Sequence, residues 1–167
     1  MKIILSFLFL SISVIAAAQR GGVTESELKK LVGSWAGTLT YTDYSDDKTQ
    51  STLPAKLEIV DLKDSLGFNY TYTEPNGKLV TDKSSLRFYT EGDKLGIDGE
   101  TWFLSEVRRR GIRLTLIADK DATDNNKEAE IRKIITIGPS TLNIIKQVKY
   151  KGAKDYFIRN KTELQKK

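Results

Sequence analysis

The residues that could carry chemistry in this 167-residue chain are limited by two absences, because it contains no Cys and no His. Disulfides, thiolate nucleophiles, His-ligated zinc or haem, and triads built on imidazole are therefore excluded. The sequence has no Gly-rich phosphate loop, and no spacing favours a carboxylate pair such as Glu100 with Glu106, or a Ser with a Lys base. We predict that the protein is not an enzyme and uses no cofactor and no metal ion.

Acidic residues crowd one segment of the chain. Asp119, Asp121, Asp124, Asn125 and Glu128 could supply oxygen ligands to calcium. The spacing departs from the EF-hand loop, because no Gly occupies the sixth position counted from Asp119. We expect a polar loop over residues 119–126 and a solvated acidic hairpin, and calcium binding stays open as the alternative.

Two lysines give the most informative polar pattern. If residues 138–141 form a hairpin loop, Lys133 lies directly opposite Lys146 on the apolar side of both strands. Opposed ammonium groups repel and desolvated cations need partners, so the pair requires water, a protein carboxylate or an anionic ligand. The functional hypothesis places an acidic headgroup between the two lysines. The alternative places both at an open rim in solvent, or reverses their direction through a β-bulge.

The remaining charge is dispersed along the chain. The formal net charge is +5, but basic residues are interleaved with acidic ones over most of the sequence. The tightest basic group is Arg108–Arg110 with Arg113, which we interpret as a solvated hairpin turn rather than a binding patch. We therefore expect no nucleic-acid partner.

The first 18 residues have the pattern of a secretory signal peptide. Lys2 provides the positive start, residues 3–15 form an apolar run, and Ala16–Ala18 supply small residues at the cleavage positions. The run is shorter than the roughly 20 residues that span a bilayer. We predict cleavage near Ala18, a single domain over residues 19–167, and export to the periplasm or the medium with no integral membrane segment in the mature chain.

The elements that must position these residues are mostly strands. Thr24 and Glu27 have capping-box spacing, which predicts one short helix through Leu31. From Trp35 onward, apolar and polar residues alternate with period two in about ten short segments. We predict an all-β fold, with one antiparallel up-and-down meander closed into a barrel of about 8 to 10 strands. A two-sheet sandwich is the alternative architecture.

The predicted inward positions include residues that could contact a ligand. These are Tyr41, Phe68, Tyr70, Tyr72, Phe88 and Trp102, together with Lys133 and Lys146. A barrel of this size can hold one small ligand, with a hydrophobic body among the aromatic rings. The alternative is that these side chains fill the interior and leave no cavity.

The segment Gly33-Ser34-Trp35, at the start of the first strand, resembles the G-x-W signature of lipocalins and their calycin relatives, which include fatty-acid-binding proteins. In that family the Trp closes one end of the barrel and an Arg on the last strand lies across its ring. The resemblance implies that Gly33, Trp35 and Arg159 close this barrel. The chain departs from lipocalins because only eight residues follow Arg159, where lipocalins carry a longer helix.

These sequence patterns lead to two hypotheses about function. The first is an exported lipocalin-like protein that carries or scavenges a small hydrophobic or acidic amphipathic ligand. The second is a non-catalytic interaction protein with a filled barrel, whose loops at residues 43–50 and 108–113 bind an envelope protein or a polysaccharide. The sequence leaves the oligomeric state open.

Overall fold

The computed structural model describes residues 22–167, which form one short helix and ten strands. The helix is α1 (Glu25–Lys29), and the strands are β1 (Gly33–Thr42), β2 (Gln50–Asp61), β3 (Ser65–Thr73), β4 (Leu79–Phe88), β5 (Lys94–Ile97), β6 (Glu100–Arg110), β7 (Arg113–Asp124), β8 (Lys127–Ile137), β9 (Thr141–Tyr150) and β10 (Phe157–Lys166). The predicted signal peptide and its cleavage site lie outside the described residues. Between residues 22 and 167, no helix is long and apolar enough to cross a bilayer.

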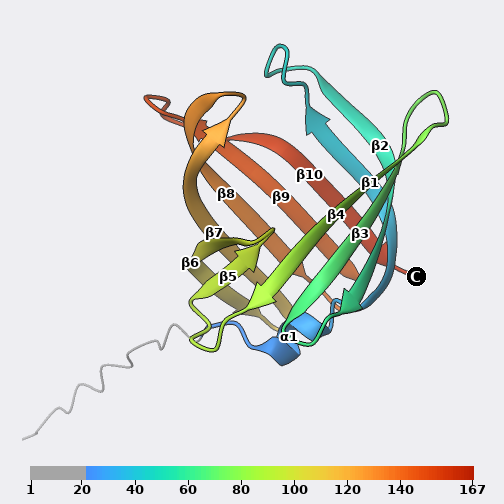
Figure 1. The fold of residues 1–167 in the computed structure, drawn as a ribbon, viewed down its shortest axis with the longest axis vertical. Coiled ribbons are helices and arrows are strands. Elements are labelled where there is room, and N and C mark those ends of the chain that lie inside the picture. Colours follow the sequence, from blue (N-terminus) through green and yellow to red (C-terminus); the bar gives the residue numbers. More distant parts are fainter. Residues whose placement is uncertain (1–21) are drawn as a thin grey trace, which may run out of the picture.

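The ten strands form one closed antiparallel barrel, which confirms the predicted all-β fold and rules out the sandwich. Each strand pairs with its neighbours in the sequence, and β1 also pairs with β10 to close the sheet. In Figure 1, α1 lies across one end of the barrel, which we call the closed end. The opposite end carries the loop between β1 and β2, and we call it the open end.

The helix α1 covers the closed end because its first turn is capped and its apolar side is buried. Thr24 accepts a hydrogen bond from the backbone N–H of Glu27, and the Glu27 carboxylate accepts one from the backbone N–H of Thr24, which is the predicted capping box. Leu28 and Leu31 are fully buried. The Trp35 indole N–H donates to the Leu31 carbonyl at 2.8 Å, so the helix and the first strand are joined at this end.

Apolar side chains fill the closed half of the barrel. They come from alternate positions of successive strands, as the period-two pattern predicts. The buried core includes Leu57, Ile59, Leu66, Phe68, Leu86, Leu95, Trp102, Leu116, Ile135, Leu142 and Leu164.

The predicted contact between Trp35 and Arg159 is wrong. Trp35 pairs with Lys166 in the ladder between β1 and β10, whereas Tyr41 pairs with Asn160, so Arg159 lies toward the other end of the barrel. The residues after Arg159 continue β10 to Lys166, and the Lys166 ammonium lies 5.3 Å from the Trp35 ring centroid. A different cation therefore covers the Trp, and the barrel closes without the expected arginine.

The closed end is also held by an ion pair between α1 and β6. The Arg109 guanidinium donates to both carboxylate oxygens of Glu27, at 2.7 and 2.9 Å, and to the Gly22 carbonyl at 2.8 Å. The hydrogen bond from Arg109 is the main reason that the pKa of Glu27 falls from 4.5 to about 2. The ionised form of Glu27 is therefore favoured in the folded state.

We expect Glu27→Gln to lower the free energy of unfolding at neutral pH by about 1–2 kcal/mol, because Arg109 is partly exposed and solvent screens the pair. The folded-state pKa is depressed, so the contribution is present above the ordinary pKa of 4.5 and is lost as the pH falls toward 2. Urea unfolding at several pH values measures this difference. Glu25→Gln, which removes an exposed pair with Lys29, is the control and should cost less than about 0.5 kcal/mol. Equal effects of the two variants would contradict this role for Glu27.

Candidate functional site

A β-bulge in β10 places an arginine inside the open half of the barrel. Ile158 pairs with Gln147 and Asn160 pairs with Lys146, so Arg159 is the extra residue between two registers. Ile158 is exposed, whereas Arg159 is buried and Asn160 lines an interior cavity. The bulge thus directs two consecutive side chains inward, which regular alternation does not allow.

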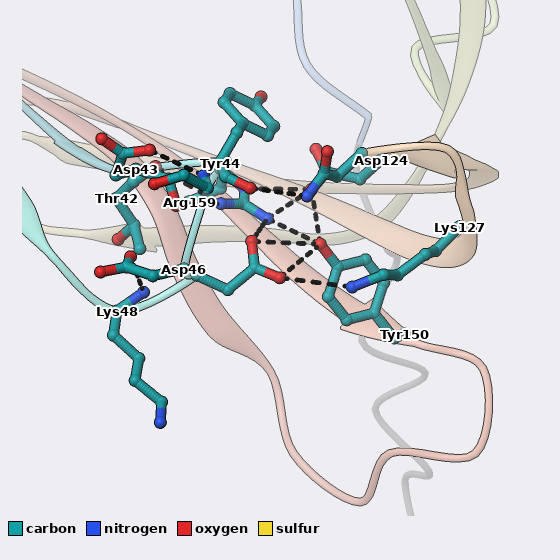
Figure 2. A network of polar contacts seen from close by, with 12 residues as sticks. Thr42, Asp43, Tyr44, Asp46, Lys48, Asp124, Lys127, Tyr150 and Arg159 are labelled. Carbon is teal, nitrogen blue, oxygen red and sulfur yellow. Dashed lines mark hydrogen bonds and ion pairs between the residues drawn. The ribbon is translucent and has the colours of Figure 1, made fainter.

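Arg159 is the centre of a polar network between three parts of the chain (Figure 2). Its guanidinium donates to Asp124 Oδ2 at 2.8 and 3.0 Å, and both side chains are only 1% exposed. It also donates to Asp47 Oδ1 and to the Tyr150 hydroxyl, each at 2.7 Å. Asp47 belongs to the loop between β1 and β2, so the network ties this loop to the barrel wall.

A further hydrogen bond holds the same loop on the turn between β7 and β8, where the Asn125 amide donates to the Tyr44 carbonyl at 2.8 Å. The Arg159 guanidinium also lies 4.2 Å from the Tyr44 ring centroid. The loop is therefore packed against charged and polar groups of the barrel rather than extended away from it.

The predicted polar loop over residues 119–126 is wrong, because β7 continues to Asp124 and β8 begins at Lys127, but the two strands do form the predicted hairpin. Only Asn125 and Asn126 form the turn, and both have positive φ, which Asn tolerates and a two-residue hairpin of the common type requires. Period-two alternation along the longer strand places Asp124 inside the barrel. The sequence pattern named Asp124 only as a possible calcium ligand and did not predict its burial, because the acidic segment was interpreted as a loop.

The acidic segment is neutralised by basic side chains rather than assembled around one point. Asp119 binds Arg132 at 2.7 Å, and Glu128 binds Lys151 at 2.5 Å, while Asp124 faces the interior cations. In the part of the chain that the structure describes, no group of three or more acidic side chains is arranged to hold a metal ion. The calcium interpretation therefore has no geometric support.

The predicted opposition of Lys133 and Lys146 is confirmed by the register between β8 and β9. The Lys146 ammonium donates to Asp124 Oδ1 at 2.6 Å. Burial alone raises the pKa of Asp124, but hydrogen bonds and charges from Lys146 and Arg159 outweigh it and hold the pKa below its usual value. A protein carboxylate, one of the three partners expected for the lysine pair, therefore neutralises Lys146.

Lys133 is compensated far less well. Its ammonium lies 3.7 Å from Asp98 Oδ2, and Asp98 accepts shorter hydrogen bonds from the Ser84 hydroxyl and the Ser85 N–H. Burial lowers the pKa of Lys133, and the Asp98 charge only partly opposes this effect. The ammonium also lies 5.0 Å from the ring centroid of Trp102, whose buried indole N–H has no hydrogen-bond partner among the described residues. The Lys133 ammonium and the Trp102 indole N–H are therefore hydrogen-bond donors without a full set of acceptors in the described chain.

The open half of the barrel contains a cavity of about 420 Å³. It brings together five of the eight predicted ligand contacts, namely Tyr41, Tyr70, Tyr72, Lys133 and Lys146. The other predicted contacts, Phe68, Phe88 and Trp102, do not line it, since they pack within or against the apolar core. Its lining also includes Leu39, Asp82, Lys83, Ser84, Asp98, Ile144, Asn160 and Thr162. The barrel is therefore filled at one end and hollow at the other.

The tyrosines form an aromatic wall for this cavity. The rings of Tyr70 and Tyr72 are stacked, with centroids 5.7 Å apart. Burial raises the pKa of Tyr70 well above its ordinary value and, together with the charge of Asp82, raises that of Tyr72 to about 12. Both phenols therefore stay neutral and can donate hydrogen bonds at physiological pH.

The cavity lies beside a part of β4 that, within the described chain, has no ladder partner on the β5 side. Strand β5 has four residues and pairs with β4 only from Leu86 to Phe88, so no strand of residues 22–167 lies beside the earlier part of β4 there (Figure 1). Asp82, Lys83 and Ser84 all line the cavity. Because consecutive strand residues face opposite sides, this lining follows the edge of β4 as well as its inner face.

A closed up-and-down barrel with a plugged end and a polar, partly hollow end defines a lipocalin-like fold. The same fold occurs in Rv2717c from M. tuberculosis, with a TM-score of 0.61 and 15% identity over 85% of this chain and 96% of that one. It also occurs in the S-type phycobiliprotein lyase CPES from Guillardia theta, with a TM-score of 0.60 and 12% identity over 86% and 92%. By sequence, the chain matches no protein-family model and no curated protein. These two likenesses, at 15% and 12% identity, show the barrel fold and carry no family.

We expect Asp124→Asn to lower the free energy of unfolding by about 3–5 kcal/mol, because it leaves two cations with too little negative charge in a buried site. Since the folded-state pKa of Asp124 is depressed, the difference from wild type should be largest above the ordinary Asp pKa and shrink in acid. Denaturant unfolding measures both effects.

The matched control for this prediction is Asp121→Asn on the same strand, where the side chain is exposed. It should change the free energy of unfolding by less than about 0.5 kcal/mol. If Asp124→Asn also changed the free energy of unfolding by less than about 0.5 kcal/mol, the network around Arg159 would not stabilise the open half of the barrel.

Proposed function

We propose that the protein binds a small amphipathic molecule in the open half of the barrel, with an acidic group at Lys133 and an apolar body against the tyrosine wall. The observation that carries this proposal is the incompletely compensated ammonium of Lys133 in a cavity of about 420 Å³. An anionic oxygen would supply the acceptor that Asp98 provides only at 3.7 Å. Lys146 contributes less, because Asp124 already accepts its hydrogen bond.

The lining supports an amphipathic ligand rather than a purely polar one. Leu39 and Ile144 provide aliphatic surface, and Tyr70 and Tyr72 provide stacked rings. The cavity is also lined by polar side chains, among them Ser84, Asn160 and Thr162, which would fix the orientation of a bound molecule. The anionic end would lie near Lys133 and the apolar end along the aromatic wall.

We propose binding without catalysis. One neighbour of the same fold is named a lyase, but a likeness at 12% identity carries the fold and no activity. The interaction-protein alternative has less support, because the loop between β1 and β2 is held by Asp47 and Tyr44, and because the barrel is not filled.

We further propose that the protein is exported, on the basis of the signal-peptide pattern. Amino-terminal sequencing of the protein purified from its native host should begin at Gln19. A chain that retains Met1 and stays with the cytoplasmic fraction would contradict this proposal.

The binding proposal predicts that decanoate binds at least about tenfold more tightly than decanol, because a charge-assisted hydrogen bond contributes about 1.5–3 kcal/mol. Lys133→Gln should remove this preference while retaining binding of decanol. Lys146→Gln should reduce the preference by less. Isothermal titration calorimetry on the full chain measures all three.

Lys161→Gln is the control, because it removes one positive charge from β10 where Lys161 pairs with Glu163 outside the cavity lining. This variant should keep the preference for decanoate. Equal binding of decanoate and decanol to wild type, or no binding of either, would overturn the proposal. So would an equal loss in the Lys133 and Lys161 variants.

A further inference from the structure

Basic side chains gather at the closed end, far along the barrel from the ligand cavity. Lys30 follows α1, Arg109 and Arg113 flank the turn between β6 and β7, and Lys166 ends β10. These four side chains line one surface pocket of about 590 Å³. We call them, together with Arg110, the basic corner.

The positive charge of the basic corner is poorly neutralised. The one acidic residue in the pocket lining is Glu27, which is already bonded to Arg109. Arg110 lies directly opposite Arg113 in the ladder between β6 and β7. Neither of these two arginines has an ion-pair partner among residues 22–167, and like charges placed opposite each other destabilise a ladder. The arrangement therefore favours binding of external negative charge.

An apolar residue projects from the middle of this charge. Ile112 lies in the two-residue turn of the hairpin and is 82% exposed, the largest exposed fraction of a bulky apolar side chain in the described part of the protein. Gly111 supplies the positive φ that the turn needs, so the turn itself does not require an isoleucine. A polar residue at position 112 would serve the hairpin equally well and would avoid exposing apolar surface.

We propose that the basic corner is a docking surface for a bilayer that contains anionic phospholipid. Ile112 enters the boundary between headgroups and acyl chains, while Lys30, Arg110 and Arg113 contact the headgroup phosphates. An apolar tip surrounded by cations matches the chemistry of an anionic membrane surface, which attracts basic residues and accepts apolar ones. The two features together select a bilayer over a soluble polyanion, which would use the charge but not the isoleucine.

This docking would orient the protein on the membrane. The basic corner is at the end closed by α1, whereas Lys133 and the cavity are in the open half. The open end would therefore face away from the bilayer and stay accessible to solvent. The inference does not depend on the identity of the cavity ligand.

The test is cosedimentation of the full chain with vesicles of phosphatidylcholine alone or mixed with phosphatidylglycerol. We expect binding to the mixed vesicles, weakening as salt is raised, and little binding to phosphatidylcholine alone. Arg110→Gln with Arg113→Gln should weaken binding about 25-fold, or about fivefold for each charge. Ile112→Ser should weaken it about tenfold.

The matched control is Lys78→Gln with Lys154→Gln, which removes two exposed charges from turns at the open end. This control should bind as wild type, and thermal melts should show that all variants are folded. Three results would overturn the proposal: no binding to the mixed vesicles, an equal loss in the control, or unchanged binding in Ile112→Ser. Displacement from the vesicles by millimolar inorganic phosphate would also overturn it, since the site would then recognise a free anion.

Discussion

The buried ion pair between Asp124 and Arg159 determines what the open half of the barrel can contain. Removing two charges from water is costly unless each is well bonded, and here the cost is offset because Lys146 donates a hydrogen bond to Asp124, and Arg159 donates to the Tyr150 hydroxyl and to the Asp47 carboxylate. Apolar side chains cannot take the place of these partners. Apolar residues such as Val148 and Phe157 pack beside the network, and of the network residues only Lys146 also lines the cavity.

The same network makes the two interior lysines unequal. Lys146 and Lys133 are opposite each other on neighbouring strands, but Asp124 is within hydrogen-bond distance of only Lys146. Lys133 is left with Asp98, which is already shared with the serines of β4. The charge that can attract a ligand is thus set by a residue that does not itself line the cavity. The interior of the barrel is therefore apolar toward the closed end and charged toward the open end.

Local patterns were sufficient to predict much of this arrangement. The alternation of apolar and polar residues predicted the strands and the inward-facing tyrosines. Counting residues outward from the predicted turn at residues 138–141 placed Lys133 opposite Lys146. Both predictions depend only on geometry that is local in the sequence. The bulge at Arg159 could not be predicted, since one extra residue reverses the direction of the side chains that follow. The burial of Asp124 depends on the length of the hairpin formed by β7 and β8. The sequence feature that indicates this length is the pair Asn125-Asn126, which forms its two-residue turn. The Trp35 contact failed because β10 extends well beyond Arg159.

The central claim is that Lys133 carries a partly buried charge that is available to an acidic ligand. It is tested most directly by nuclear magnetic resonance titration of lysine side chains labelled with ¹³C at Cε, with the Lys133 signal assigned through Lys133→Gln. The account predicts a pKa for Lys133 below the ordinary value of 10.5 in the ligand-free protein, and a rise when decanoate is added. An ordinary pKa that does not change with decanoate would contradict it.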